Sequence, residues 1–241
     1  MQFYGATDKG KQRENNQDYF NFEILSENCG FAIVCDGMGG ANAGNIASSM
    51  ATENIASYLK RSLKPSMSSN QIEMILRSAV YSANTAVYET SLKDENYKGM
   101  GTTVVLMYVD DKFIYIVHVG DSRAYSFYDN SLEQITVDHS MVQTMVDNGQ
   151  LTPDEAMVHP SKNIITRAVG VGEQVNVDLN FEEVSEGKVL LLCSDGLSNY
   201  VSVNEIEEQL KNFDESISER LIDIANKNGG GDNITVVAVK F

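Results

Sequence analysis

The chain has 241 residues, of which 18 are Lys or Arg and 34 are Asp or Glu, so its formal net charge is −16. Hydrophobic residues make up 42% and charged residues 22%, a composition typical of globular proteins. The acidic balance disfavours nucleic acid or an anionic membrane surface as the main partner. No stretch approaches the roughly 20 apolar residues of a membrane helix. No apolar signal segment follows Met1, so we expect a cytoplasmic protein without membrane insertion.

The sequence contains few cysteines and histidines, which limits the reactions that these side chains could carry out. Cys29, Cys35 and Cys193 lie in or beside apolar stretches, which predicts reduced core thiols. A cysteine-based phosphatase needs an Arg six positions after its Cys, and those positions hold Cys35, Ala41 and Asn199. The 3 histidines are too few for a His-rich binuclear metal site. Neither a Walker-type phosphate loop nor a Gly-x-Ser-x-Gly nucleophile turn occurs.

The first half of the chain is predicted to form strands followed by two helices. Strands are predicted at 2–8 and 19–25, and the unbroken apolar run Phe31–Cys35 predicts a buried strand. Apolar residues at helical spacing predict helices over 43–63 and 71–92, separated by a link that contains Pro65.

The second half alternates strands and helices. Three predicted strands, at 102–109, 112–119 and 123–128, are joined by short turns, and we expect an antiparallel meander. Two short helices over 140–163 follow, the second with Thr152 as N-cap. The remaining elements are predicted strands at 132–136, 175–182, 188–193 and 234–240 and helices at 202–211 and 216–227. We interpret residues 1–241 as a single α+β domain.

Acidic residues follow or precede the most apolar strands. Asp36 follows 31–35 and Asp195 follows 189–193 after one Ser, and each of the two is itself followed by Gly. Asp18, Asp121 and Asp232 occupy similar positions beside other strands. Each alone suits an ordinary turn, but five carboxylates at the rim of a core are costly unless they are paired or bound to metal. Oxygen ligands without His favour Mg²⁺ or Mn²⁺ over Zn²⁺.

The N-terminal turn contains a basic residue that has two interpretations. Arg13 precedes Asp18 by five positions in a polar segment. Beside a metal site it could clamp a phosphate through two of its guanidinium nitrogens, and otherwise it is a surface Arg in a loop. The spacing alone leaves both interpretations open.

Nine short motifs occur in a fixed order between residues 5 and 237. They are Gly5…Gly10…Arg13-x-x-Asn16-Gln17-Asp18, Val34-Cys-Asp36-Gly37-Met-Gly39-Gly40, Gly101-Thr102-Thr103, Val119-Gly120-Asp121-Ser122-Arg123-Ala124-Tyr125, Asp138-His139-Ser140, His159-Pro160, Ile165-Thr-Arg167-Ala-Val-Gly170, Cys193-Ser-Asp195-Gly196-Leu197 and Gly231-Asp232-Asn233-Ile-Thr235. The ordered set resembles the metal-dependent protein phosphatases, the type 2C serine/threonine class. The run Asp36-Gly-Met-Gly-Gly resembles the bacterial branch of that family.

The resemblance implies a fold and a reaction. The fold is two antiparallel sheets packed face to face between helices, an αββα sandwich, with residues 140–165 as a small mobile helical flap. The reaction is hydrolysis of phosphoserine and phosphothreonine in proteins by a metal-bridging water or hydroxide, without a phosphoenzyme. A cognate bacterial Ser/Thr kinase and its substrates are the implied partners, and we expect a monomer.

The resemblance also assigns the acidic residues to metals. Asp36 would bridge two Mn²⁺ or Mg²⁺ ions and the Gly37 carbonyl would bind the second. Asp195 and Asp232 would hold the first ion, and Asp18 would act through water. Asp121, together with Asp195, matches the pair that binds a third, weaker ion in bacterial members, and Arg13 would hold the substrate phosphate.

One position departs from many eukaryotic members, which have His where this chain has Met38. That His is a proposed general acid, and Met cannot donate a proton. His139 and His159 are the other titratable candidates, and a structural role is the favoured interpretation for both. We expect His118, inside an apolar strand, to be a core residue.

Two alternatives remain open from the sequence. The protein could be a phosphatase restricted to one regulatory phosphoprotein. It could instead be a catalytically inactive binding module on the same fold, although Arg13 and all the expected acidic positions are present. An acidic scaffold or cation buffer would explain the charge but not the ordered motifs.

Overall fold

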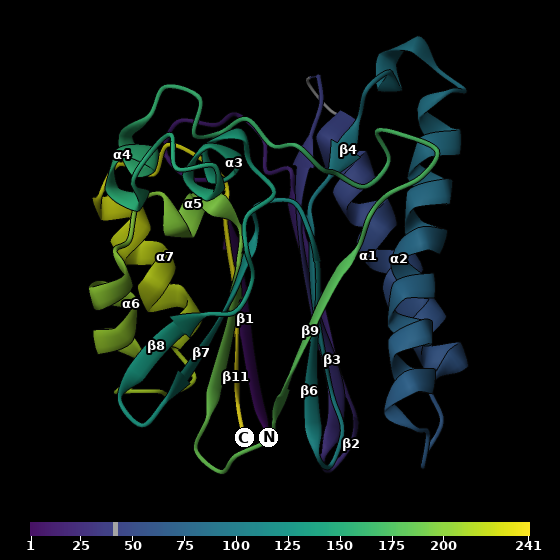
Figure 1. Cartoon of the computed structure of the whole chain (residues 1–241), viewed down its shortest axis with the longest axis vertical. Coiled ribbons are helices and arrows are strands. Elements are labelled where there is room, and N and C mark those ends of the chain that lie inside the picture. Colours follow the sequence, from purple (N-terminus) through teal and green to yellow (C-terminus); the bar gives the residue numbers. More distant parts are fainter. Residues whose placement is uncertain (41–42) are drawn as a thin grey trace.

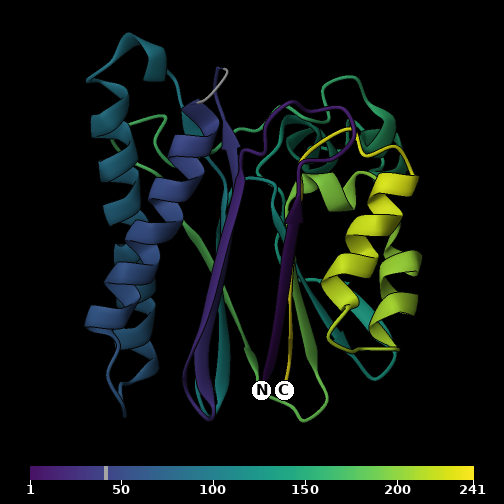
Figure 2. The same cartoon turned by 180° about the vertical axis from the view of Figure 1, so that it is seen from behind.

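The computed structural model describes residues 1–40 and 43–241. Two antiparallel β-sheets lie face to face, with helices on both outer sides (Figures 1 and 2). One sheet has the strand order β1 (Gln2–Asp8), β11 (Ile234–Lys240), β10 (Val189–Cys193), β7 (Arg123–Tyr128) and β8 (Ser131–Gln134). The other has the order β2 (Asp18–Ser26), β3 (Cys29–Met38), β5 (Val104–Val109), β6 (Phe113–Val119) and β9 (Asp178–Glu183), and β4 (Gly101–Thr102) pairs with the end of β3. The expected αββα sandwich is confirmed.

Two long helices cover the outer face of the six-stranded sheet, α1 (Ala43–Ser62) and α2 (Ser69–Ser91). The N-cap of α2 is Ser68, whose hydroxyl accepts from the backbone of Gln71 while the Gln71 side chain accepts from Ser68 in return. This capping box satisfies two backbone donors and fixes where α2 begins. A short 3-10 helix, η1 (Glu95–Tyr97), follows.

The continuous apolar run in β3 reflects burial on both faces of its sheet. Phe31, Ile33 and Cys35 pack against α1 and α2, whereas Ala32 and Val34 lie in the core between the two sheets. Side chains of a strand alternate between faces, so a strand buried on both sides needs apolar residues throughout. The apolar strand β10 follows the same pattern, with its odd-numbered residues facing the helices of the other side.

Three helices cover the outer face of the five-stranded sheet: α5 (Asp195–Ser198), α6 (Val203–Leu210) and α7 (Ile217–Lys227). The one-turn helix α5 was not among the predicted elements, because four residues are too few to show helical periodicity. All three cysteines are free thiols, with Cys35 and Cys193 buried, as predicted.

The predicted meander is wrong at its third strand. β5 and β6 pair, but β6 pairs next with β9, and β7 pairs with β10 and β8 in the opposite sheet. The chain crosses from one sheet to the other at 120–122, where Gly120 has a φ of 108°. Such a positive φ is readily adopted only by glycine, and it turns the chain away from the strand that a hairpin would have added.

The segment 140–165 contains α3 (Met141–Asp147) and α4 (Pro153–Val158), close to their predicted positions. Thr152 caps α4 in a capping box with Glu155, as the sequence predicts. Both helices lie at the opposite end of the sandwich from the two termini (Figure 1). None of the helices in the described part of the chain is long and apolar enough to span a bilayer.

Candidate active site

The predicted acidic residues meet at the end of the sandwich beside segment 140–165. All of them except Asp18 line a cavity of about 250 Å³. Its walls include Arg13, Asp36, Gly37, Asp121, Asp195 and Asp232, together with Gln17, Met38, Gly39, Thr103, Asn163, Ile165 and Asn233. Asp18, the remaining predicted residue, is not part of the wall and is only 4% exposed. Residues far apart in the sequence thus form one oxygen-rich cavity.

Asp36 is held in place through its backbone. Its N–H donates to the Thr103 hydroxyl at 2.9 Å. Its carbonyl accepts from the Thr103 amide at 2.8 Å and from the Thr102 hydroxyl at 2.9 Å. Asp36 also lies opposite Asp18 in the antiparallel register of β2 and β3, so the hydrogen-bonded pairing of two strands brings these two carboxylates together.

Close packing of backbones explains the glycine after each of the two strand-end aspartates. A Cβ at Gly37 would lie 2.1 Å from the Gly44 carbonyl oxygen and 2.5 Å from that of Gln17. A Cβ at Gly196 would lie 1.9 Å from the carbonyl oxygen of Asn233. No side chain fits at such distances, so only glycine lets the strand end and its neighbour approach this closely.

Ser194 ties β10 to β11 and also contacts Asp18. Its hydroxyl accepts from the Thr235 amide at 2.9 Å and donates to Asp18 Oδ2 at 2.6 Å. Asp195 follows directly and begins α5. The position of Asp195 is therefore fixed by the pairing of the last two strands of the five-stranded sheet.

Asn233 organises the N-terminal loop and had no assigned role in the sequence analysis. Its Oδ1 accepts from the Gln17 amide at 2.8 Å. Its Nδ2 donates to the carbonyls of Lys9 and Asn15, both at 2.9 Å. One buried amide thus holds three backbone groups of the loop that carries Arg13. The only sequence signal was an Asn in the motif Gly231-Asp232-Asn233, which also suits an ordinary turn.

Arg13 lies at the rim of the cavity. Its Nη2 donates to Asp232 Oδ2 at 2.8 Å, and its side chain remains 53% exposed. The bond to Asp232 raises the pKa of Arg13, and Asp195 and Asp36 act in the same direction. A permanent cation with free donors facing a cavity can bind an anionic group there.

Most of the clustered carboxyl groups have raised pKa values. Burial and the neighbouring carboxylates raise the pKa of Asp36 well above its ordinary value. Burial also raises the pKa of Asp18 and of Asp121 to about 7, and that of Asp195 to about 6. In each case mutual repulsion among the acidic groups adds to burial. When all of these carboxyl groups are deprotonated, too little positive charge lies near them to offset their mutual repulsion.

The unsatisfied oxygens fit a cation. Asp18 Oδ1 and Asp195 Oδ1 are buried without a hydrogen-bond partner, although buried carboxylate oxygens normally have one. The carboxylates of Asp36, Asp121, Asp195 and Asp232 in the wall suit hard divalent cations such as Mg²⁺ and Mn²⁺. The residues present therefore fit bound divalent metal, and a cation would relieve both the missing bonds and the repulsion.

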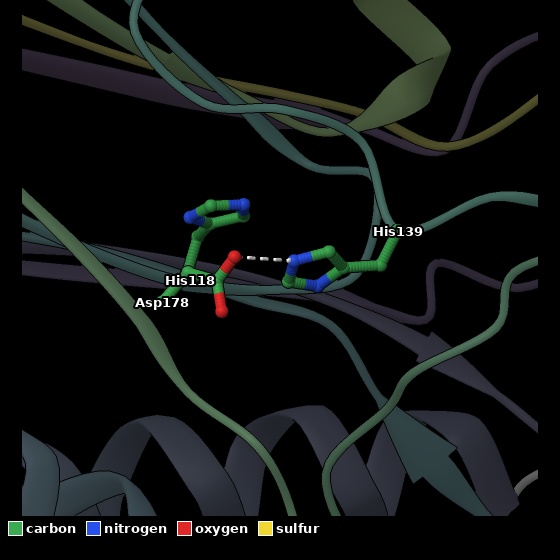
Figure 3. Close-up of side chains that lie close together, drawn as sticks. All are labelled: His118, His139 and Asp178. Carbon is green, nitrogen blue, oxygen red and sulfur yellow. Dashed lines mark hydrogen bonds and ion pairs between the residues drawn. The ribbon is translucent and has the colours of Figure 1, made fainter. Parts of the chain in front are cut away.

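The three histidines lie outside this cavity. His118 is buried, as predicted, and its ring stacks on that of His139 at a centroid distance of 4.6 Å. His139 Nε2 lies 3.2 Å from Asp178 Oδ2 (Figure 3). Together His118, His139 and Asp178 form a separate group of side chains whose potential ligating atoms lie close together. His159 accepts a local bond from the Ser161 amide at its own Nδ1.

Met38 lines the cavity at the position where the sequence departs from many eukaryotic relatives of the resembled family. Its thioether cannot donate a proton. Within the described part of the chain, neither Cys nor His lines this cavity. The described wall of the cavity thus offers carboxylates, a guanidinium and the Thr103 hydroxyl, but neither a thiol nor an imidazole.

Comparison with known proteins matches nearly the whole chain. The family described as Protein phosphatase 2C matches residues 7–233. The serine/threonine phosphatase Stp of Listeria welshimeri is 38% identical over 237 residues, which cover 97% of this chain and 93% of that protein.

Solved structures agree with the sequence match. The S. agalactiae serine/threonine phosphatase has a TM-score of 0.91 and 36% identity and covers 98% of both chains. The catalytic domain of the phosphatase PstP, in complex with two manganese ions, has a TM-score of 0.84 and 32% identity, covering 99% of this chain and 97% of that one.

The family match includes the whole of the acidic cavity. The matched range 7–233 contains Arg13, Asp18, Asp36, Asp121, Asp195 and Asp232. Both the sequence relative and the structural neighbours are serine/threonine phosphatases. The chain therefore belongs to the protein phosphatase 2C family and is a metal-dependent protein serine/threonine phosphatase.

Proposed function

We propose that the acidic cavity is the catalytic centre and that it holds two Mn²⁺ or Mg²⁺ ions. Asp36 would contact both ions, the Gly37 carbonyl would help to hold the second, and Asp195 and Asp232 would hold the first. Asp18 acts through water from its buried position. The observation that carries this proposal is the convergence of four aspartates on one cavity, where three have raised pKa values and Asp195 has a buried oxygen without a hydrogen-bond partner. The two manganese ions of the PstP complex agree with this number.

The bound cations supply activation of water and neutralisation of phosphate charge. The residues of the chain position the substrate phosphate. Arg13, held by Asp232 at the rim, binds the phosphate oxygens and orients the phosphorus toward the carboxylates. Since neither Cys nor His lines the described cavity, direct attack by water without a phosphoenzyme is the simplest route. Met38 donates no proton, so the leaving oxygen takes its proton from solvent.

A third, weaker cation is proposed beside Asp121 and Asp195. Asp121 is 9% exposed and borders the same cavity, and repulsion from Asp195 contributes to its raised pKa. A carboxylate whose pKa is raised by a neighbouring carboxylate is suited to share a cation with it. Asp121 is not among the residues proposed for the first two ions, so the third site can be removed separately through Asp121.

The substrates proposed are phosphoserine and phosphothreonine proteins of a bacterial signalling system, phosphorylated by a cognate Ser/Thr kinase. Three free thiols suit a reducing compartment, and we place the protein in the cytoplasm as a monomer. We further propose that residues 1–241 form one catalytic domain, with 140–165 as a mobile flap. The lining of the cavity by Asn163 and Ile165 supports a role of this segment in substrate contact.

The test is hydrolysis of a phosphothreonine peptide and of p-nitrophenyl phosphate with Mn²⁺, Mg²⁺, Zn²⁺ or EDTA. Activity with Mn²⁺ or Mg²⁺ should disappear with EDTA. Asp36→Asn should lower kcat by about 100-fold or more, since it alters a bridging ligand rather than an outer residue. Wild-type rates for Asp36→Asn at saturating Mn²⁺ would contradict the bridge. Turnover of only one phosphoprotein would indicate a partner-restricted enzyme.

A further inference from the structure

A polar cluster outside the catalytic cavity joins the turn that carries Asp121 to the base of segment 140–165. Its centre is His139, which is 7% exposed. The Gly120 amide donates to His139 Nδ1 at 3.1 Å, and the His139 amide donates to the Gly120 carbonyl at 2.9 Å. Residue 139 therefore holds both polar backbone groups of Gly120, the residue directly before Asp121.

The other ring nitrogen of His139 faces the chain that leaves the segment. Nε2 lies 3.2 Å from Asp178 Oδ2 (Figure 3). Asp178 Oδ1 accepts from Arg167 Nη1 at 2.9 Å. The backbone completes the link, because the Thr166 amide donates to the His139 carbonyl at 2.8 Å. We call residues 139–141 and 164–166, which pair at the entry and exit of segment 140–165, its neck.

The bonding pattern fixes the tautomer of His139. Because Nδ1 accepts a backbone N–H, the ring proton must reside on Nε2, from which it is donated to Asp178. Burial lowers the pKa of His139, and the stacked ring of His118 acts in the same direction. A neutral ring with one acceptor and one donor satisfies both Gly120 and Asp178. The third neighbour of the ring, Arg167 Nη1 at 3.1 Å from Nε2, donates to Asp178 Oδ1.

The same pattern argues against a metal ion between His118, His139 and Asp178, although their ligating atoms lie within 4.8 Å of one another. Ligation through Nε2 would move the ring proton to Nδ1, where it would face the N–H of Gly120. In addition, the Arg167 guanidinium lies 3.1 Å from Nε2, in the space that a cation would need. The opposed N–H groups of Nδ1 and Gly120 disfavour a metal ion at this position, and so does the positive charge of Arg167.

We propose that His139 is a positioning residue that couples the Asp121 turn to the neck of segment 140–165. Through Nδ1 it holds the Gly120 backbone and thus the direction of the Asp121 carboxylate. Through Nε2 it holds Asp178, Arg167 and hence the neck. This inference rests on the proposed roles of Asp121 and of the flap. It goes beyond them because one side chain, that of His139, would position both the third cation and the flap.

Two substitutions separate the two bonds of the ring. His139→Asn retains an oxygen where Nδ1 accepts from Gly120 but does not reach Asp178. His139→Gln retains a donor near Asp178 but lacks the acceptor for Gly120. His118→Gln is the matched control, because it disturbs the same stack and keeps a donor for the Val137 carbonyl, which His118 Nε2 contacts at 2.9 Å. Asp178→Ala removes the neck link at a side chain that is 46% exposed, without altering a buried ring.

The first measurement is amide hydrogen exchange of the metal-free proteins. His139→Gln should speed exchange of the Gly120 amide by roughly ten-fold, the value of one net hydrogen bond, while His139→Asn should leave it near wild type. His139→Asn and Asp178→Ala should both speed exchange of the Met141 and Thr166 amides at the neck. Equal exchange in all variants and wild type, or the same changes in His118→Gln, would overturn the proposal.

Kinetics supply the second measurement. His139→Gln should raise the Mn²⁺ concentration needed for the weakest-binding step several-fold. His139→Asn and Asp178→Ala should instead raise KM for a phosphopeptide, with little change for p-nitrophenyl phosphate, which is too small to reach the flap. Identical kinetic defects in the Gln and Asn variants would overturn the coupling. So would a Zn²⁺ ion bound by wild type and lost in both His118→Gln and Asp178→Ala.

The outcomes distinguish this inference from the proposed function. If wild-type protein hydrolyses neither substrate with any metal, the catalytic proposal fails, yet the metal-free exchange pattern still decides the role of His139. If wild type is active and the exchange pattern is absent, only the role of His139 fails.

Discussion

Arg13 and Asp232, separated by 219 positions in the chain, form a 2.8 Å ion pair at the rim of the acidic cavity. The pair joins the N-terminal loop to the turn before the last strand. Because the Arg13 side chain is 53% exposed, the pair adds little to stability. The pair instead orients the Arg13 side chain, since Asp232 holds the guanidinium beside the position where a phosphate would bind.

Arg13→Ala should therefore affect substrate binding far more than stability. We expect KM for a phosphopeptide to rise about ten-fold or more, as a charge-assisted clamp is lost, and the melting temperature to stay nearly constant. Arg13→Lys should give an intermediate KM, since it keeps the charge but not the planar fork. Steady-state kinetics and metal titration of the same samples test this. An unchanged KM would contradict the clamp.

Asp121→Ala should weaken only the third cation site. Asp121 reaches the cavity from the turn between the two sheets, whereas Asp36 reaches it from β3. Titration calorimetry with Mn²⁺ should retain the two tighter sites and lose the weakest. Loss of a tight site would show that Asp121 belongs to the main pair.

The metal-free protein should lose stability as pH rises from 6.5 to 8. Asp18 and Asp121 have folded-state pKa values near 7, well above the unfolded value of 3.8, so their stabilising protonated forms are lost across this window. The linkage amounts to about 1–2 kcal/mol in total. His118 and His139, whose pKa values are lowered, act in the opposite direction, but mainly below pH 6.5, where the unfolded histidines become charged.

Asp18→Asn is the control for this pH effect. It removes one buried charge, so the free energy of unfolding of the metal-free variant should depend less on pH between 6.5 and 8. Denaturant unfolding in EDTA measures the difference. Addition of Mn²⁺ at pH 8 should stabilise wild type more than the variant, because cations replace the lost protons only where the carboxylate remains. Parallel pH profiles of the two proteins would count against a raised pKa at Asp18.

Gly37→Ala should destabilise the fold itself. The added Cβ would lie 2.1 Å from the Gly44 carbonyl oxygen, so backbone must move. We expect the free energy of unfolding to fall by about 2–4 kcal/mol. Gly40→Ala is the matched substitution, since a Cβ there has nothing within 4 Å, and its effect should stay within about 0.5 kcal/mol. Similar losses at both positions would exclude steric packing as the reason for Gly37.

Local patterns in the sequence were sufficient for most elements. Apolar spacing predicted α1 and α2, and Thr152, Pro153 and Glu155 predicted the start of α4, because caps and periodicity act over a few residues. The one-turn helix α5 was missed, and the strand 123–128 was predicted in the wrong sheet. No local signal distinguishes a hairpin from a crossing when both begin with a Gly-Asp turn.

The sequence by itself determined the family resemblance and which carboxylates to examine, since ordered motifs are a property of the chain. Only the tertiary structure decided how those residues meet. Strand pairing placed Asp18 opposite Asp36, and the amide of Asn233 fastened the loop of Arg13. The link from His139 to Gly120 and Asp178 likewise exists only once β6, β9 and the neck come together. Such contacts join residues distant in sequence, and their energies depend on burial and direction, which no local pattern encodes.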